Sequence, residues 1–282
     1  MTLNVSIVIP TFNRCHLVSK AIDSALAQTH PVEVILCDHA SRDATPEIAS
    51  GYGSKIRYVR REIDRGPVVC WRDAIENASG DIVHITYDDD WIDPTFIERT
   101  LPLLRDDVAF VYTQGMIHVA ETEASHAEMR HPPGVRSVAG LVQHLLRSPL
   151  TISPGCALFR KKDLLKNLLP EIPGAKGLYG KNSGVGEDLL VFLLCTLDYP
   201  KYAYIPEPLA HFLAHPTSIT TNAGTSGRMD VLVDAYALAR KYYLAQPGSI
   251  PMADGVSRWL ARKLWKIRSA RKTILNAQSL RK

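Results

Sequence analysis

The sequence predicts an α/β fold in which a mostly parallel sheet is flanked by helices and followed by a helical C-terminal extension. Three apolar runs, at residues 6–9, 34–36 and 82–85, each end in polar residues. Such runs are typical of parallel strands that are buried on both faces. Helical patterns alternate with them as far as residue 113, as in βαβ units, and beyond Gln114 this alternation fails.

The individual elements follow from apolar periodicity and from residues that favour helix starts. Strands are expected within residues 6–13 and at 33–38, 56–60, 82–87, 108–113 and 157–160. Helices are expected after Asn13 as N-cap, at 44–50 and 66–78, after Pro94, and at 187–197, 227–244 and 257–275. The polar stretch 118–136, with its scattered histidines, is predicted to be a loop. Residues 170–186, with two prolines and five glycines, are predicted to form a second loop.

The composition is that of a globular protein, with 46% apolar and 22% charged residues among 282. No apolar run approaches the ~20 residues that span a bilayer, and no signal-peptide pattern begins the chain, so we expect a cytoplasmic protein. The five cysteines are odd in number and lack CxxC spacing. We therefore expect buried, reduced thiols in preference to a zinc site or a disulfide framework.

The strongest local signal is the acidic triplet Asp88-Asp89-Asp90, which directly follows an expected strand. Mg²⁺ and Mn²⁺ prefer oxygen ligands and are often held by one or two carboxylates together with substrate phosphates. An acidic turn that caps the next helix would give the same local pattern. The metal interpretation is favoured because Asp38 and Pro10-Thr11 end neighbouring strands at the same sheet edge, where ligands bind in open α/β folds.

Two later motifs add candidate functional groups. Glu187-Asp188 opens a helix after the glycine-rich loop, so a carboxylate there could act as a general base or simply favour the helix start. His211 and His215 lie four residues apart in a proline-rich stretch that argues against a helix. A single metal or phosphate contact from His215 is therefore favoured over a paired site.

Together these motifs resemble the inverting glycosyltransferases of family 2, which have the GT-A fold with a Rossmann-like sheet. The resemblance covers roughly residues 4–222 and depends on the order and spacing of several modest motifs. These are residues 6–13, Gln28-Thr29, Asp38 with Ser41 and Asp43, residues 78–81, Asp88-Asp89-Asp90 with Pro94, Glu187-Asp188, and residues 215–218. The family implies a nucleotide-diphosphate sugar donor, a Mg²⁺ or Mn²⁺ cofactor, and an in-line displacement that inverts the anomeric carbon.

The resemblance also implies roles for individual residues. The donor-binding set would be Pro10, Thr11, Asn13, Asp38, His39, Arg72 and Asp88. The metal set would be Asp89, Asp90 and His215, and Asp188 would be the catalytic base, with Glu187 and Ser218 in the loops that meet the acceptor. The chain departs from the family pattern at three positions, where it has His39, Arg72 and Leu213.

We therefore expect residues 1–222 to form the GT-A domain, with a nucleotide-sugar half (1–113) and an acceptor half (114–222), followed by an extension (223–282). The expected acceptor is a growing bacterial surface glycan, free or lipid-linked, with uridine as the first-ranked base and no nucleic-acid partner. Two alternatives remain: a metal-dependent phosphoryl-transfer or nuclease enzyme, and a non-catalytic nucleotide-binding scaffold. A dinucleotide-binding dehydrogenase is disfavoured because G-x-G-x-x-G is missing from residues 10–13.

The charge is distributed unevenly along the chain. Residues 255–282 contain nine basic residues and no acidic ones, so the remaining residues 1–254 carry a net charge of −5. An apolar stripe with two tryptophans lies among these basic residues at 257–275. This pattern is typical of a helix lying on the inner, anionic face of a membrane, but the same stripe could pack on the domain or on a second subunit.

Overall fold

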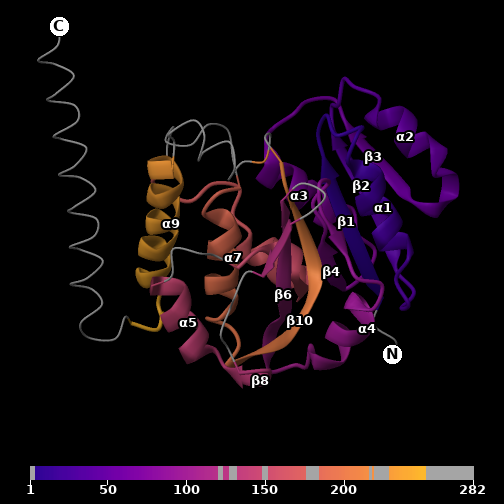
Figure 1. The fold of residues 1–282 in the computed structure, drawn as a ribbon. Coiled ribbons are helices and arrows are strands. Elements are labelled where there is room, and N and C mark those ends of the chain that lie inside the picture. The colour runs from indigo at the N-terminus through magenta and orange to yellow at the C-terminus, as the bar shows by residue number, and fades with distance from the viewer. Residues whose placement is uncertain are drawn as a thin grey trace, which may run out of the picture.

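The computed structural model describes residues 4–119, 123–126, 132–147, 152–175, 184–215, 218 and 229–251. It confirms the predicted α/β fold, with one curled sheet between two layers of helices (Figure 1). The predicted basic helix at 257–275 lies outside these residues.

Ten described strands form a single sheet. They are β1 (Val5–Thr11), β2 (Glu33–His39), β3 (Arg57–Arg61), β4 (Ile82–Ile85), β5 (Trp91–Ile92), β6 (Val108–Val119), β7 (Glu123–His126), β8 (Gly134–Ser137), β9 (Ala157–Arg160) and β10 (Lys201–Ala214). The main path is β3-β2-β1-β4-β9-β6-β10-β5, with β7 beside β6 and β8 beside β10. The first four strands are parallel, so the ends of β1, β2 and β4 share one edge, as predicted. β9 runs antiparallel to both of its neighbours.

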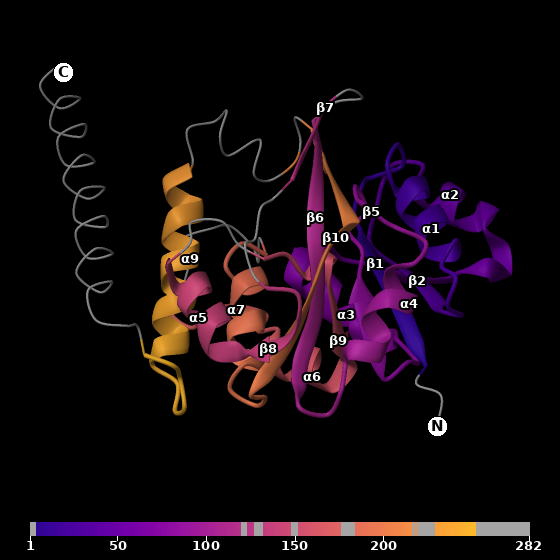
Figure 2. The same ribbon diagram turned by 60° about the horizontal axis from the view of Figure 1, so that its bottom comes forward.

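Helices cover both faces of the sheet (Figure 2). One face carries α3 (Pro67–Asn77), α5 (Val138–Arg147), α6 (Lys161–Asn167), α7 (Glu187–Cys195) and α9 (Met229–Leu244). The other carries α1 (Val18–Leu26), α2 (Thr45–Gly51) and α4 (Phe96–Thr100), and 3₁₀ turns lie at Gly53–Lys55, Leu101–Leu103 and Pro154–Cys156. Within the described ranges, no helix has both the length and the hydropathy to cross a membrane.

A polar junction holds together the starting ends of the central strands. The Ser6 hydroxyl donates to Glu33 Oε2 at 2.6 Å, and the same carboxylate oxygen accepts from the backbone and hydroxyl of Ser79 at 2.8 and 2.7 Å. Gly80 N donates to Ser6 Oγ at 2.9 Å, and a Cβ at Gly80 would lie only 2.6 Å from the Asn4 carbonyl oxygen. The motif at residues 78–81 is therefore a structural clamp, at the end of the strands opposite to the predicted site.

Two sequence expectations were wrong, and one strand was not expected. Asn13 is not a helix cap: its φ is +54°, its side chain accepts from Arg42 N at 2.8 Å, and α1 begins only at Val18. Residues 118–136 are not simply a loop, because they contain the end of β6, all of β7 and the start of β8. The proline-rich stretch at 206–208 lies inside β10, where register shifts allow prolines in a strand.

Candidate active site

The carboxyl edge of β1, β2 and β4 gathers most of the predicted site residues. In the parallel register Thr11 lies opposite Asp38, and the chain leaving β4 continues directly into the acidic triplet. Thr11 is buried, and its hydroxyl has no hydrogen-bond partner. Buried hydroxyl groups nearly always form a hydrogen bond, so the Thr11 hydroxyl at this edge is suited to bond to a bound molecule.

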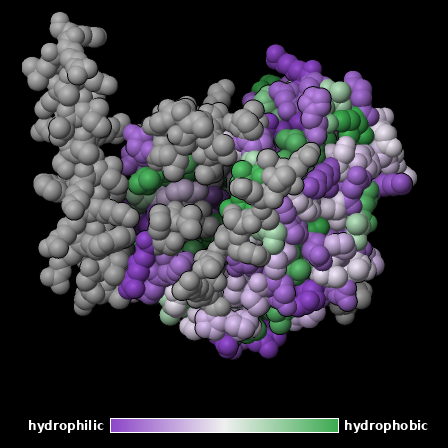
Figure 3. All heavy atoms as spheres, in the orientation of Figure 1, coloured by the Kyte–Doolittle hydropathy of each residue, from purple (hydrophilic) through white to green (hydrophobic). Residues whose placement is uncertain are grey.

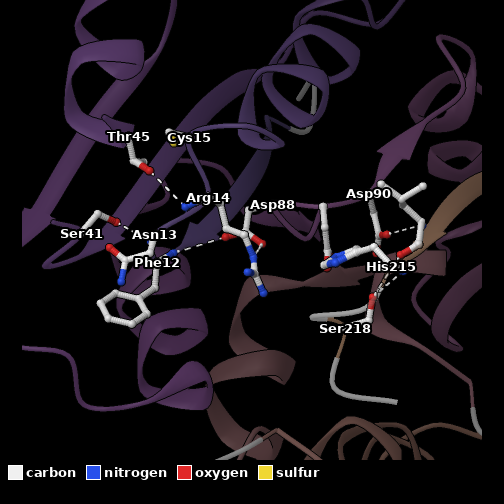
Figure 4. Close-up of polar contacts among 12 residues, drawn as sticks. Phe12, Asn13, Arg14, Cys15, Ser41, Thr45, Asp88, Asp90, His215 and Ser218 are labelled. Atoms are coloured by element: carbon white, nitrogen blue, oxygen red, sulfur yellow. Dashed lines mark hydrogen bonds and ion pairs between the residues drawn. The ribbon is translucent and has the colours of Figure 1, made fainter. Parts of the chain in front are cut away.

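The loop after β1 is fixed by hydrogen bonds to side chains of the segment that follows β2. The backbone N–H groups of residues 13 and 14 donate to Ser41 Oγ and Thr45 Oγ1 at 2.8 and 3.1 Å (Figure 4), and that of residue 15 donates to Asp43 Oδ2 at 2.9 Å. The left-handed backbone of Asn13 allows this path, and Phe12 remains 41% exposed at the rim. The exposed face seen in Figure 3 otherwise intersperses hydrophobic and hydrophilic residues.

Asp38 forms the floor between these loops and is fully buried. Its carboxylate accepts from Ser41 N at 2.8 Å and from the Tyr58 hydroxyl at 2.6 Å, and Arg60 Nη1 lies 3.8 Å away. Burial, followed by the Asp38 charge, raises the pKa of Tyr58 to about 12, so its hydroxyl stays a donor at neutral pH. The carboxylate is thus fixed in position as an acceptor at the sheet edge.

The acidic triplet is divided between two sides of the edge. Asp88 faces the first loop, where it accepts from Phe12 N at 3.3 Å and lies 3.6 Å from Arg14 Nε. Asp90 faces β10 and accepts from Leu213 N at 3.0 Å. Burial, followed by the charge of Asp89, raises the pKa of Asp88 to about 7 and raises that of Asp90 as well.

Asp89 and His215 connect the end of β4 with the end of β10. His215 Nε2 lies 3.0 Å from Asp89 Oδ2, and His215 N donates to Ser218 Oγ at 3.0 Å (Figure 4). A carboxylate oxygen and an imidazole nitrogen that converge among further carboxylates form a donor set that suits Mn²⁺ or Mg²⁺. Asp88 and Asp90 lie beside Asp89 in surroundings that disfavour several negative charges, so a bound cation would relieve their repulsion and these residues fit the implied metal.

Asp188 reaches the same edge from the start of α7. Its Oδ1 accepts from Gly186 N and Leu189 N at 2.9 and 2.7 Å, and its Oδ2 accepts from the Tyr236 hydroxyl of α9 at 3.1 Å. Asp188 N donates to Gly184 O at 3.3 Å, and a Cβ at Gly184 would lie 2.8 Å from the Trp71 ring. Trp71 in turn packs on Tyr87, which precedes the triplet, with ring centroids 5.3 Å apart, so the start of α7 lies beside this part of the edge. Burial also raises the pKa of Asp188 itself to about 6.

Glu187 occupies a different environment from its neighbour. It is 6% exposed, its Oε2 has no hydrogen-bond partner, and burial raises its pKa to about 7. The positions of Glu187 and Asp188 depend on the turn that precedes them. In this turn Gly184 and Gly186 have φ of +80° and +96°, a backbone conformation that only glycine adopts readily. A Cβ at Gly186 would lie 3.0 Å from the Ala235 carbonyl oxygen, so this turn brings α9 close to α7.

Two residues of the predicted donor set lie elsewhere. Arg72 Nη1 donates to the carbonyl oxygens of Leu165 and Leu168 at 2.9 and 2.6 Å, so its guanidinium joins α3 to the end of α6. His39 is 1% exposed and lies beside Asp73 of α3. Because successive strand side chains point to opposite faces, His39 points away from the Asp38 side of β2.

An aromatic and histidine cluster beside the triplet was not predicted from the sequence. Lys20 Nζ lies 3.0 Å from the Trp91 ring centroid, Trp91 stacks on His211 at 5.3 Å, and His118 Nε2 lies 3.1 Å from His211 Nδ1. Trp91 directly follows Asp90, which was the available sequence signal. The histidines are 93 positions apart and meet only because β6 and β10 pair.

Comparison with known proteins identifies the class of this α/β domain. The family model "Glycosyl transferase family 2" matches residues 6–168, which is more than half of the chain. The chain therefore belongs to glycosyl transferase family 2 and is a glycosyltransferase.

Individual relatives match shorter parts of the chain. An uncharacterised glycosyltransferase of Rickettsia typhi is 38% identical over 101 residues, 36% of this chain and 31% of the relative. The Escherichia coli protein WfgD, named as a UDP-Glc:alpha-D-GlcNAc-diphosphoundecaprenol beta-1,3-glucosyltransferase, is 31% identical over 111 residues, 38% of this chain and 44% of that protein. The matches thus span less than half the length of both relatives.

The fold is shared with solved structures of S. aureus TarS. Residues 1–349 of TarS, crystallised with UDP-GlcNAc, superpose with a TM-score of 0.61 at 15% identity, covering 86% of this chain and 70% of that one. A second crystal structure of the same TarS segment gives 0.60 at 16% identity, covering 86% and 69%. This similarity supports the GT-A type of fold predicted from the sequence.

Proposed function

We propose that the protein is a metal-dependent, inverting glycosyltransferase that moves a sugar from a nucleotide-diphosphate donor to a hydroxyl of a bacterial surface glycan. The observation that carries this proposal is the convergence of Asp38, Asp88, Asp89, His215 and Asp188 on one sheet edge. The names of WfgD and of the TarS complex, which refer to UDP-sugars, support the donor class.

The donor would bind between the two loops at the ends of β1 and β2. Asp38 is positioned to accept from the base or ribose, and the buried Thr11 hydroxyl is available for a further hydrogen bond. Pro10 and Asn13 shape the wall of this pocket, and Asp88 would meet the ribose. Because Asp38 is already fixed by Ser41 and Tyr58, little reorganisation accompanies binding.

Asp89 and His215, with Asp90 beside them, would hold Mg²⁺ or Mn²⁺. The ion supplies positive charge that neutralises the diphosphate as it leaves. Ser218 holds the backbone of His215, and Asp90 holds that of Leu213, so the end of β10 is fixed by two side-chain contacts. The family usually has an arginine two residues before this histidine, where this chain has Leu213. The contact with Asp90 is made by the backbone of Leu213 and does not involve its side chain.

Asp188 is placed to act as the general base. It would accept the proton of the acceptor hydroxyl while that oxygen bonds to the anomeric carbon and the bond from this carbon to the diphosphate oxygen breaks. One displacement of this kind inverts the anomeric configuration. With a pKa of about 6, Asp188 is mainly ionised at neutral pH and is a stronger base than an exposed aspartate. Glu187, which is buried near the backbone of Ile172, is assigned to the support of the loop.

The test is a thermal-shift panel of uridine, thymidine and guanosine diphosphates, with and without Mn²⁺. We expect uridine diphosphate with Mn²⁺ to stabilise the protein most, by about 2.7 kcal/mol at a hundredfold excess over its Kd. Asp89→Ala should abolish the Mn²⁺-dependent part of this shift, whereas Asp106→Ala, which removes an exposed carboxylate in the turn before β6, should leave it unchanged. Equal stabilisation of Asp89→Ala and wild type by every nucleotide would refute the metal assignment.

A metal-dependent nuclease or phosphoryl-transfer enzyme is the second candidate. It would need carboxylates that converge from several strands around two ions, and among the described residues of this edge only Asp38 is placed to join the acidic triplet. The two activities are distinguished by their products. A glycosyltransferase forms a glycosylated acceptor from a nucleotide-sugar and does not cleave nucleic acid.

A further inference from the structure

A second cluster of chemically reactive side chains lies on the other face of β2 from Asp38. It consists of Cys37 and His39 on β2 and Cys70 on α3. The two Sγ atoms and one imidazole nitrogen all lie within 4.8 Å of one another. The three residues are 0%, 1% and 4% exposed. We call them the Cys-His-Cys cluster; none of them has a role in the glycosyl transfer proposed above.

The imidazole of this cluster lacks the partners that a buried histidine normally has. Neither Nδ1 nor Nε2 of His39 makes a hydrogen bond, although the ring is almost completely buried. Asp73 Oδ2 lies 3.3 Å from Nε2, close enough for an ion pair but without the direction of a hydrogen bond. Buried polar groups in native proteins are nearly always satisfied, so an imidazole that faces two thiols and has only the Asp73 carboxylate near it, without a well-aligned hydrogen bond, indicates a missing ligand.

The charges around the cluster suit a cation. The neighbouring Cys70 thiol and, after the opposing effect of burial, the His39 ring lower the pKa of Cys37 to about 6. Asp73 is held in place by Arg61 Nε at 2.9 Å and Arg65 Nη2 at 3.5 Å. A fixed carboxylate therefore lies beside the imidazole, as is common for metal-bound histidines.

We propose that Cys37, His39 and Cys70 bind one zinc ion, with Asp73 orienting the His39 ring. Thiolates and imidazole are the ligands that zinc prefers, whereas the oxygen-rich set around Asp89 suits Mg²⁺ or Mn²⁺. Zinc bonds of about 2.3 Å to sulfur and about 2.0 Å to nitrogen separate neighbouring ligands by less than 4 Å, so small side-chain movements close the cluster.

The site would lie beneath the candidate nucleotide pocket. His39 follows Asp38 in the chain and ends β2, so a zinc ion there would tie the end of this strand to α3. The sequence could not show the site, because Cys37 and Cys70 are 33 positions apart and follow no zinc-binding motif. Four of the five cysteines are buried, as expected, and a zinc site would give two of them a role beyond that of buried thiols.

The test uses the full-length protein, freed of metal and titrated with Co²⁺ as a spectroscopic substitute for zinc. We expect thiolate-to-cobalt charge-transfer absorption that saturates at one equivalent and disappears when Zn²⁺ is added. Oxygen ligands give no such absorption, so the Asp89→Ala variant should behave as wild type. Bound zinc is measured in parallel by elemental analysis after gel filtration.

Variants separate this cluster from the remaining cysteines. Cys37→Ser and Cys70→Ser should each lower zinc affinity at least a hundredfold, whereas Cys195→Ser, which also removes a fully buried thiol, should leave it unchanged. The cobalt spectrum of the wild-type protein decides the question even if a cluster variant does not fold. Absence of the charge-transfer band in wild type, or an equal loss in Cys195→Ser, would overturn the proposal. A Cys37–Cys70 disulfide in protein purified under reducing conditions would also overturn it.

Discussion

Replacing Asp188 by asparagine should remove catalysis and at the same time stabilise the protein. Asparagine keeps an oxygen that can accept from Gly186 N and Leu189 N, so the start of α7 is preserved. It cannot take a proton from an acceptor hydroxyl, and turnover should fall by ~10²-fold or more. Donor affinity should hold, because Asp188 is assigned to the acceptor and not to the nucleotide.

The stability effect can be estimated from the pKa of Asp188. Its value of about 6 in the folded state lies roughly two units above that of an exposed aspartate, and this difference corresponds to at most about 3 kcal/mol. The folded pKa is raised, so the ionised carboxylate destabilises the fold fully above pH 6, and this cost disappears as the pH falls toward 4. Asp188→Asn should therefore gain most at pH 8 and about half as much at pH 5.

The assay is urea unfolding of wild type and variants at pH 8 and pH 5, without metal or nucleotide, together with turnover at pH 8. Glu187→Gln is the matched control, since Glu187 is also a buried carboxylate with a pKa raised to about 7. Both substitutions should stabilise the protein more at the higher pH. Glu187→Gln alone should retain turnover within a few-fold of wild type.

Two results would refute this reasoning. Unchanged turnover of Asp188→Asn in an assay that detects wild type would show that another group accepts the proton. A stability difference between Asp188→Asn and wild type that is the same at both pH values would show that the Asp188 carboxylate is not destabilised by burial.

Three further predictions follow from contacts described above. Tyr236→Phe removes a hydrogen bond that lowers the pKa of Asp188, so the acidic limb of the pH–kcat profile should move upward by about half a unit, and a downward shift would contradict this. Gly80→Ala should cost about 1–3 kcal/mol in urea unfolding, because its Cβ would meet the Asn4 carbonyl, whereas Gly140→Ala, in open space, should cost nothing. Truncation after residue 254 should abolish co-sedimentation with anionic vesicles at low salt if the basic helix is a membrane contact; loss of the fold would instead assign the helix to the core or to an interface between subunits.

The sheet edge could be predicted because its signals are local. Each parallel strand is a short apolar run that ends in polar residues, and parallel strands in βαβ units must place these ends together. Asp38 and the acidic triplet were therefore assigned to one site from their position after the runs. The helix α5 was also visible in principle, since Leu141, Val142, Leu145 and Leu146 repeat at helical spacing and are all buried.

The remaining features depend on contacts between distant segments. Pro206 and Pro208 indicate a connection when read locally, and only the bulged pairing of β10 with β6 allows them in a strand. Arg72 has the charge expected of a diphosphate ligand, but its guanidinium is taken by two carbonyl groups of the α6 end. No local pattern could show either outcome, because in both cases the partner lies far away in the sequence.

The position of α9 changes what counts as the catalytic unit of this chain. Both the matched family segment and our expected domain boundary at residue 222 end before this helix. Ala235, Ala239 and Tyr243 of α9 are nevertheless fully buried, and Tyr236 contacts the candidate base. A shorter protein that ends at residue 222 would lack α9. It would expose the apolar side of α7 and lose the Tyr236 hydrogen bond that lowers the pKa of Asp188. The chain through residue 251 is therefore the smallest piece in which activity should be measured.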